Sequence, residues 1–220
     1  MNRILKSATC LSVLAVCALT MPTTAQSQSK PAGDGPKETT RFDGPTMDPA
    51  AKQKMIENMM AMMQPGPEHK RLERMVGSWN VVTKYWMEPG APPKSIDGKS
   101  RCEMALGGRF LRCELKGEFE GMPFEALNLI GFDRRTDKYT SVAFDTMGTY
   151  YVTAEGEYDT ATKSIRMHGQ THDPKLNHTE IYTMVWREVS DDQYVQEVWF
   201  KPTPEGQAVK VVESTCTRVK

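Results

Sequence analysis

The strongest constraint on the fold is a regular alternation of apolar and polar side chains that runs from Gly77 to the carboxyl terminus. Turn-forming residues interrupt it at a spacing of about ten residues, which is typical of an all-β sandwich or barrel. The connections are short, so consecutive strands should pair as an antiparallel meander. We expect ten strands, at residues 78–88, 96–106, 109–119, 123–133, 138–147, 149–158, 163–171, 178–189, 193–201 and 208–219.

The strand faces test this meander, because opposed residues of an antiparallel pair point to the same side of the sheet. The expected turns make Cys102 oppose Cys113, and Gly156 oppose Ile165. One continuous face is then apolar and holds Met104, Leu111, Leu115, Ile130, Val152, Ile165 and Met167. The other face carries Arg101, Glu103, Arg112, Glu114, Glu125, Asp133, Glu155, Glu157, Arg166 and His168. We take the apolar face as the interior of a closed barrel, which leaves no exposed sheet edge.

The first 25 residues have the pattern of a secretory signal peptide. Arg3 and Lys6 precede an apolar run over residues 7–21, and small residues stand before the expected cleavage site after Ala25. The run is shorter than the roughly 20 residues that span a bilayer. We therefore expect cleavage, no stable membrane insertion afterwards, and a periplasmic or secreted protein.

Three further segments follow the expected signal peptide. Residues 26–47 are rich in Gln, Ser, Pro, Gly, Lys and Thr and predict a disordered linker. Residues 48–66 predict a short Met-rich helix, because Asp48 suits the N-cap, Pro49 suits the first turn, and Pro65-Gly66-Pro67 ends the segment. Residues 67–220 are expected to form the barrel domain.

Charge and cysteines narrow the function classes. Removing residues 1–25 takes away two basic residues and no acid, so the net charge changes from 0 to −2. Without a basic cluster the chain has no electrostatic signature of nucleic-acid binding.

Cys102 and Cys113 can form a cross-strand disulfide in an oxidising compartment, with Cys216 left as a buried thiol. A two-residue turn at Gly107-Gly108 would give that pair a Cα separation of about 5.5 Å, so the sequence leaves the bond open.

The start of the first strand, Gly77-Ser78-Trp79, resembles the G-x-W signature of the calycins. These include lipocalins, fatty-acid-binding proteins, avidins and nitrobindins. The resemblance implies a calycin-like barrel in which the tryptophan closes one end. It also implies that an arginine of the last strand, here Arg218, packs over that ring.

A longer resemblance covers residues 67–220 and is to domain-of-unknown-function family 1579 (DUF 1579). It rests on Pro67-Glu68-His69-Lys70, Gly107-Gly108-Arg109-Phe110-Leu111, Gly121-Met122-Pro123-Phe124, Gly131-Phe132-Asp133, Asp145-Thr146-Met147-Gly148-Thr149 and Asp173-Pro174. The resemblance implies the fold and brings no activity, catalytic residue or cofactor with it.

Polar side chains on the interior face are the candidate ligand-binding residues. We predict Asn128, Asp145 and Tyr150, with Ser141 nearby. A buried carboxylate is costly unless it is hydrogen-bonded or paired, and ligand cavities often use such groups to orient a ligand. The alternative is that Asp145 only caps the turn at Met147-Gly148.

The histidines indicate no metal or haem site. His172 and His178 are expected to oppose each other across a hairpin beside Asp173, on the exterior face. Imidazole and carboxylate suit zinc or copper, but no tight ligand spacing supports a site, and His168 is too far along its strand. We predict exposed histidines, no metal and no cofactor.

The methionines of the helix have two interpretations. Met55, Met59, Met60, Met62 and Met63 could provide thioether ligands for cuprous copper. The simpler interpretation is an apolar stripe at helical spacing that packs against the barrel mouth or a partner protein.

The sequence contains no G-x-S-x-G motif, no cysteine with a nearby histidine and no paired-carboxylate motif, so no catalytic residue is predicted. The leading hypothesis is an exported module that binds a small apolar or amphipathic molecule in a mostly apolar cavity, gated or covered by the helix at 48–63. The alternative is a filled structural barrel whose helix binds a protein partner. An enzyme is the third hypothesis.

Overall fold

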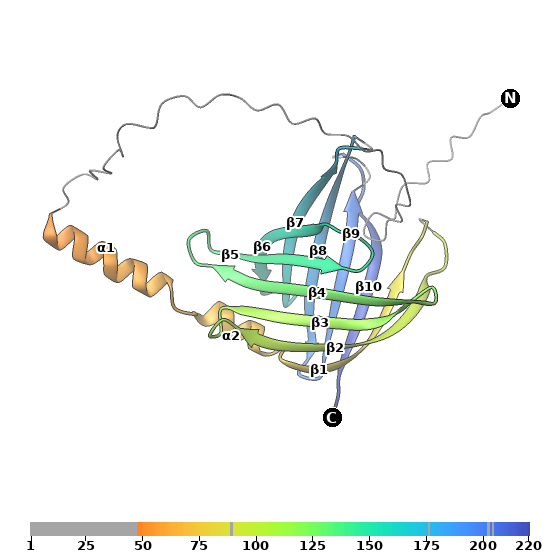
Figure 1. Ribbon diagram of the computed structural model, residues 1–220, viewed down its shortest axis with the longest axis horizontal. Coiled ribbons are helices and arrows are strands. Elements are labelled where there is room, and N and C mark those ends of the chain that lie inside the picture. The colour runs from red at the N-terminus through yellow and green to blue at the C-terminus, as the bar shows by residue number, and fades with distance from the viewer. Residues whose placement is uncertain (1–47, 89, 176, 202, 204) are drawn as a thin grey trace, which may run out of the picture. The chain divides into compact units, whose positions relative to one another are not determined.

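The fold is a closed β-barrel, as a computed structural model shows for residues 48–220 apart from residues 89, 176, 202 and 204. Ten strands pair in sequence order, and β1 pairs with β10 to close the barrel (Figure 1). Every pair is antiparallel, which confirms the predicted all-β meander. The strands are β1 (Gly77–Tyr85), β2 (Lys94–Ala105), β3 (Phe110–Phe119), β4 (Met122–Asp133), β5 (Lys138–Asp145), β6 (Tyr151–Asp159), β7 (Ser164–Asp173), β8 (His178–Ser190), β9 (Gln193–Lys201) and β10 (Val209–Arg218).

The predicted interior face is also confirmed. Its side chains form the core, either fully buried or packed against it: Leu111, Ile130, Ile165 and Met167, then Met104, Leu115 and Val152. One expected pairing is wrong, since Gly156 lies opposite Met167 and not Ile165. The turn takes up residues 160–163 rather than the expected residues 159–162. This shifts the register by two residues, so no side chain changes face.

The segment before β1 contains a helix, α2 (Pro67–Glu73), which contacts β3 and β4. Pro67 suits its first turn, where a missing N–H costs little. The Gly66 backbone N–H donates to Nδ1 of His69 at 3.0 Å. Leu72 is fully buried in the barrel core. Seven residues are too few for a helical period to stand out in the sequence.

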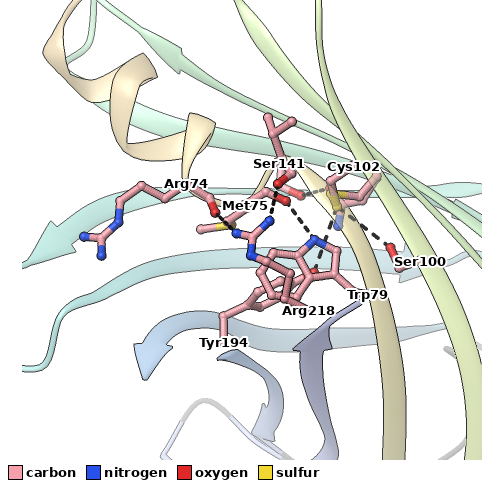
Figure 2. The surroundings of a disulfide bond; sticks show 11 residues. Arg74, Met75, Trp79, Ser100, Cys102, Ser141, Tyr194 and Arg218 are labelled. Carbon is pink, nitrogen blue, oxygen red and sulfur yellow. Dashed lines mark hydrogen bonds between the residues drawn. A yellow bond between two sulfur atoms is a disulfide. The ribbon is translucent and has the colours of Figure 1, made fainter. Parts of the chain in front are cut away.

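Trp79 and Arg218 close this end of the barrel, as the resemblance to calycins implied. The Trp79 ring is 1 % exposed, and its Nε1 donates to the Met75 carbonyl at 2.9 Å. The Arg218 guanidinium lies 4.2 Å from the ring centroid (Figure 2). It also donates to the carbonyls of Val76 at 2.7 Å and Arg74 at 2.8 Å. One side chain of the last strand thus holds the segment that leads into the first.

Cys102 on β2 and Cys113 on β3 are joined by a disulfide, so the question left open by the sequence is answered. Their Cα atoms are 4.1 Å apart, not the expected 5.5 Å. The loop takes residues 106–109 rather than Gly107-Gly108 alone, and the cysteines form a close pair of the non-hydrogen-bonded kind. Cys216 is a buried free thiol, and burial raises its pKa to about 11.

The other described helix, α1 (Pro49–Met62), belongs to a separate compact unit. The Asp48 side chain accepts a hydrogen bond from the Ala51 N–H at 3.2 Å, as expected of an N-cap. Along the described chain no helix has the length and hydropathy needed to cross a membrane. The predicted signal peptide and the predicted linker at residues 26–47 lie outside the described residues.

Trp79→Ala should lower the free energy of unfolding by about 3–5 kcal/mol, because it removes a buried aromatic ring and leaves Arg218 without its stacking partner. Urea unfolding measures the change. Trp199→Ala is the control, since Trp199 is half-buried and its Nε1 bonds only to Glu197 on the same strand. Equal losses in the two variants would contradict this role for Trp79.

Replacing both Cys102 and Cys113 by alanine should cost about 3 kcal/mol, the loop entropy that a cross-link of this span removes from the unfolded chain. Unfolding of the oxidised wild type and of the double variant gives the difference. In the presence of reductant the wild type should approach the variant. A variant as stable as the oxidised protein would show that the disulfide contributes nothing.

Candidate functional site

A cavity of about 190 Å³ lies inside the barrel. Cys113, Tyr194 and Cys216 line the part of the cavity near the end of the barrel closed by Trp79. Tyr85 and Phe119 line the part toward the other end. Apolar side chains form most of the wall between these two parts, among them Val81, Leu115, Val152, Met184 and Val198. The barrel is therefore not completely filled by its own side chains.

One wall of the cavity carries a row of polar side chains from four neighbouring strands. Trp186 pairs with Gln196, Gln196 with Ser214, and Ser214 with Thr83. The hydroxyls of Thr83 and Ser214 are hydrogen-bonded at 2.8 Å. Trp186 is 2 % exposed, and its Nε1–H has no acceptor among the described residues. A buried donor without a partner is costly, so this wall has an unmet hydrogen bond.

The opposite wall contains Asn128, one of the predicted ligand-binding residues. It lines the cavity from β4, where it pairs with Cys113 and Ala143. The Ser141 hydroxyl donates to its Oδ1 at 2.9 Å, so the amide orientation is fixed by a buried neighbour. The cavity thus has polar groups on two facing walls and apolar groups between them.

Asp145 ends β5 and lines both the cavity and a shallow depression on the outside of β3–β5. Its Oδ1 accepts a hydrogen bond from the Met147 N–H at 2.8 Å, so it does cap the turn as well. It forms no ion pair with any described residue. Burial raises the pKa of this carboxyl, and hydrogen bonds from the turn backbone oppose the rise only in part.

Tyr150, the third predicted residue, does not line the cavity and is 45 % exposed. It lies close enough to Asp145 and Glu180 for both carboxylates to add to the rise in its pKa, which comes chiefly from burial. Of the three residues predicted from the sequence, the structure thus places Asn128 and Asp145 in the cavity wall and Tyr150 outside it.

The residues that the sequence missed are on β9, β10 and β1. Thr83, Gln196 and Ser214 were not identified, although the alternation that located Asn128 continues through β8–β10. Extending the face assignment from Trp186 across β9 and β10 to β1 would have found this row. Closure of β1 on β10 is what brings its two ends together.

The histidines of the β7–β8 hairpin are paired differently from the prediction. The opposition of His172 and His178 is wrong by one residue, because His172 pairs with Thr179 and Asp173 with His178. His178 therefore belongs to the inward-facing series of β8 with Met184 and Trp186 and not to the exterior face. His168 and His172 bond the hydroxyls of Thr183 and Thr179, respectively. Within the described chain, no group of three or more histidine, cysteine, aspartate or glutamate side chains could hold a metal ion.

Residues 64–218 match the family model DUF1579, described as a protein of unknown function. The match includes α2 and all ten strands. The chain belongs to the DUF1579 family. No curated protein matches this DUF1579 protein.

Three solved structures are similar to this DUF1579 protein. Rv2717c from M. tuberculosis has a TM-score of 0.51 and 12% identity, over 71% of this chain and 100% of that chain. A redesigned beta barrel, b11L5F_LGL, has a TM-score of 0.37 and 12% identity, over 68% and 96%. EF1p2_mFAP2b bound to DFHBI has a TM-score of 0.39 and 9% identity, over 69% and 98%. At these identities the likeness to Rv2717c supports the barrel fold alone, and the other two scores are too low to carry an argument.

Asp145→Asn should stabilise this DUF1579 protein at neutral pH, because the folded state holds the Asp145 proton more tightly than the unfolded chain does. Below the ordinary aspartate pKa of 3.8 the two proteins should be equally stable. As the pH rises through the raised pKa, the wild type should lose stability relative to the variant. Melting temperatures between pH 3 and pH 7 measure this.

Asp133→Asn is the matched control with the opposite sign. A hydrogen bond from the Arg135 side chain lowers the pKa of Asp133 to about 2. Its contribution to stability is present above pH 3.8 and is lost as the pH falls through about 2. This variant should therefore be less stable than the wild type at pH 7. If the difference in melting temperature from the wild type changed with pH in the same direction in both variants, the environment described for Asp145 would be contradicted.

Proposed function

We propose that this DUF1579 protein is an exported binding module that takes a small, mostly apolar molecule into its barrel. The observation that carries the proposal is the cavity of about 190 Å³ within a closed barrel. A dry cavity of about 150 Å³ is enough to bind benzene in another protein. The ligand that fits is therefore compact, of the size of a short alkyl chain or a single ring.

The polar groups of the cavity wall support the proposal that the cavity binds a ligand. Small-molecule sites are mostly apolar, with a few polar groups that orient the ligand. Here Asn128 and Gln196 face the cavity from different walls, and the Trp186 Nε1–H has no acceptor in the described protein. An acceptor atom on a ligand, or a water bound with it, would supply that missing partner.

Two features support a location outside the cytoplasm. The first 25 residues have the pattern of a cleaved signal peptide. The disulfide between Cys102 and Cys113 is a bond that persists in oxidising compartments. Export to the periplasm or the medium is therefore part of the proposal.

The second candidate function is binding of a protein partner by α1. The five methionines of α1 and its C-cap expose 46–59 % of their surface, and the helix has no buried side chain. Such a flexible apolar surface suits adaptable protein contacts. Deleting residues 48–63 separates the two functions, since a ligand-binding barrel keeps its affinity and an α1-dependent complex is lost.

Ala143→Phe should abolish ligand binding, because it places a ring in the cavity from β5. Native mass spectrometry of the protein purified from its own compartment should show a bound small molecule on the wild type and none on the variant. Val142→Phe is the matched control, since the neighbouring side chain points out of the barrel. An adduct-free wild type, or an adduct kept by Ala143→Phe, would contradict binding in the cavity.

A further inference from the structure

The charge of the cavity wall restricts the ligand that it can accept. Asp145 is the single charged side chain among the described residues that line it. No lysine, arginine or histidine contributes to the wall. A carboxylate or phosphate ligand would therefore enter a cavity that offers its charge no cation, which is costly in an apolar site.

Asp145 itself lacks the cation that neighbouring carboxylates have. On the outside of the same strands, Glu125 lies 3.2 Å from Lys116 and Glu155 lies 2.8 Å from Lys138. Asp145 has only backbone N–H donors from its own turn, and burial penalises its charge. An incoming cation at this point would offset that penalty.

A second carboxylate that has no ion pair within the described chain lies on the inward-facing series of β8. Glu180 continues the inward-facing series of β8 beyond Trp186 and Met184, and it forms no ion pair with a described residue. Burial raises the pKa of the Glu180 carboxyl. His178 opposes this rise, and Asp173 adds to it. Burial raises the pKa of Tyr150, and the charges of Asp145 and Glu180 add to that rise.

The aromatic residue next to Asp145 belongs to the outer face of the barrel. Phe144 is 41 % exposed, and its ring centroid lies 5.9 Å from that of Tyr151, which is 60 % exposed. These rings do not face the cavity, so Asp145 is the group that would contact a cation there. The apolar cavity and the Trp186 Nε1–H, which has no acceptor among the described residues, are independent indications that a ligand occupies the cavity.

We propose that the ligand is an organic amine, with its apolar body in the barrel cavity and its ammonium group against Asp145. This rests on the proposed binding function and adds the charge of the ligand to it. The Asp145 carboxylate accepts hydrogen bonds from the ammonium, and the charge of Glu180 on β8 adds to the attraction. Neutral molecules of the same shape bind more weakly, and carboxylates are rejected.

Three six-carbon probes that differ in the charge of one end test the proposal: hexylamine, hexan-1-ol and hexanoate. Calorimetric titration of the full-length mature protein at pH 7 should give hexylamine an affinity at least about tenfold higher than hexan-1-ol, with no binding of hexanoate. Asp145→Asn should reduce the affinity for hexylamine to that for hexan-1-ol and leave the alcohol unchanged. The asparagine keeps the turn cap, because its side-chain oxygen can still accept from Met147.

Glu157→Gln is the control variant, since it removes the same charge from the exposed outer face of β6 and should change nothing. If Asp145→Asn does not fold, Glu180→Gln replaces it, with an expected loss of about threefold for hexylamine alone. Equal binding of amine and alcohol, an unchanged amine affinity in Asp145→Asn, or tighter binding of hexanoate would overturn the amine proposal and leave cavity binding standing. Binding of none of the three probes would overturn both proposals.

Discussion

The barrel depends on the contact between Arg218 and Trp79. The guanidinium stacks on the ring and also donates to the carbonyls of Arg74 and Val76, so it joins the last strand to the segment before the first. Pairing of β1 with β10 alone would close the sheet but would leave its end open. With α2 and Trp79 in place, this end is packed, and the cavity lies in the part of the barrel beyond Tyr194 and Cys216.

The closed end and the cavity differ in how they satisfy polar groups. Near Trp79 the buried donors have partners, for example the Trp79 Nε1–H on the Met75 carbonyl. In the cavity wall, the Trp186 Nε1–H has none in the described protein, and the Asp145 carboxylate has no cation. Buried polar groups are normally satisfied, because an unpaired one costs about 1–3 kcal/mol. Stability is therefore lower where the proposed ligand binds, which is common at functional sites.

Much of the fold could be predicted because a strand has a period of two. Alternation placed Leu111, Ile130 and Met167 inside the barrel even where the register was wrong by two residues, as at Gly156. The errors came from short elements. Helix α2 has seven residues, too few to show a helical period, and the hairpin at His172 was shifted by one residue because its turn was misjudged.

The sequence by itself determined the strands, most of their inner and outer faces, and the opposition of Cys102 and Cys113, since all three follow from local alternation and neighbouring turns. It also marked Asn128 and Asp145 as inward-facing polar residues. Only the tertiary structure decided that the barrel keeps a cavity, because a void depends on how side chains from distant strands meet across it. The row from Trp186 through Gln196 and Ser214 to Thr83 exists for the same reason, as β10 must return to β1 before these residues become neighbours.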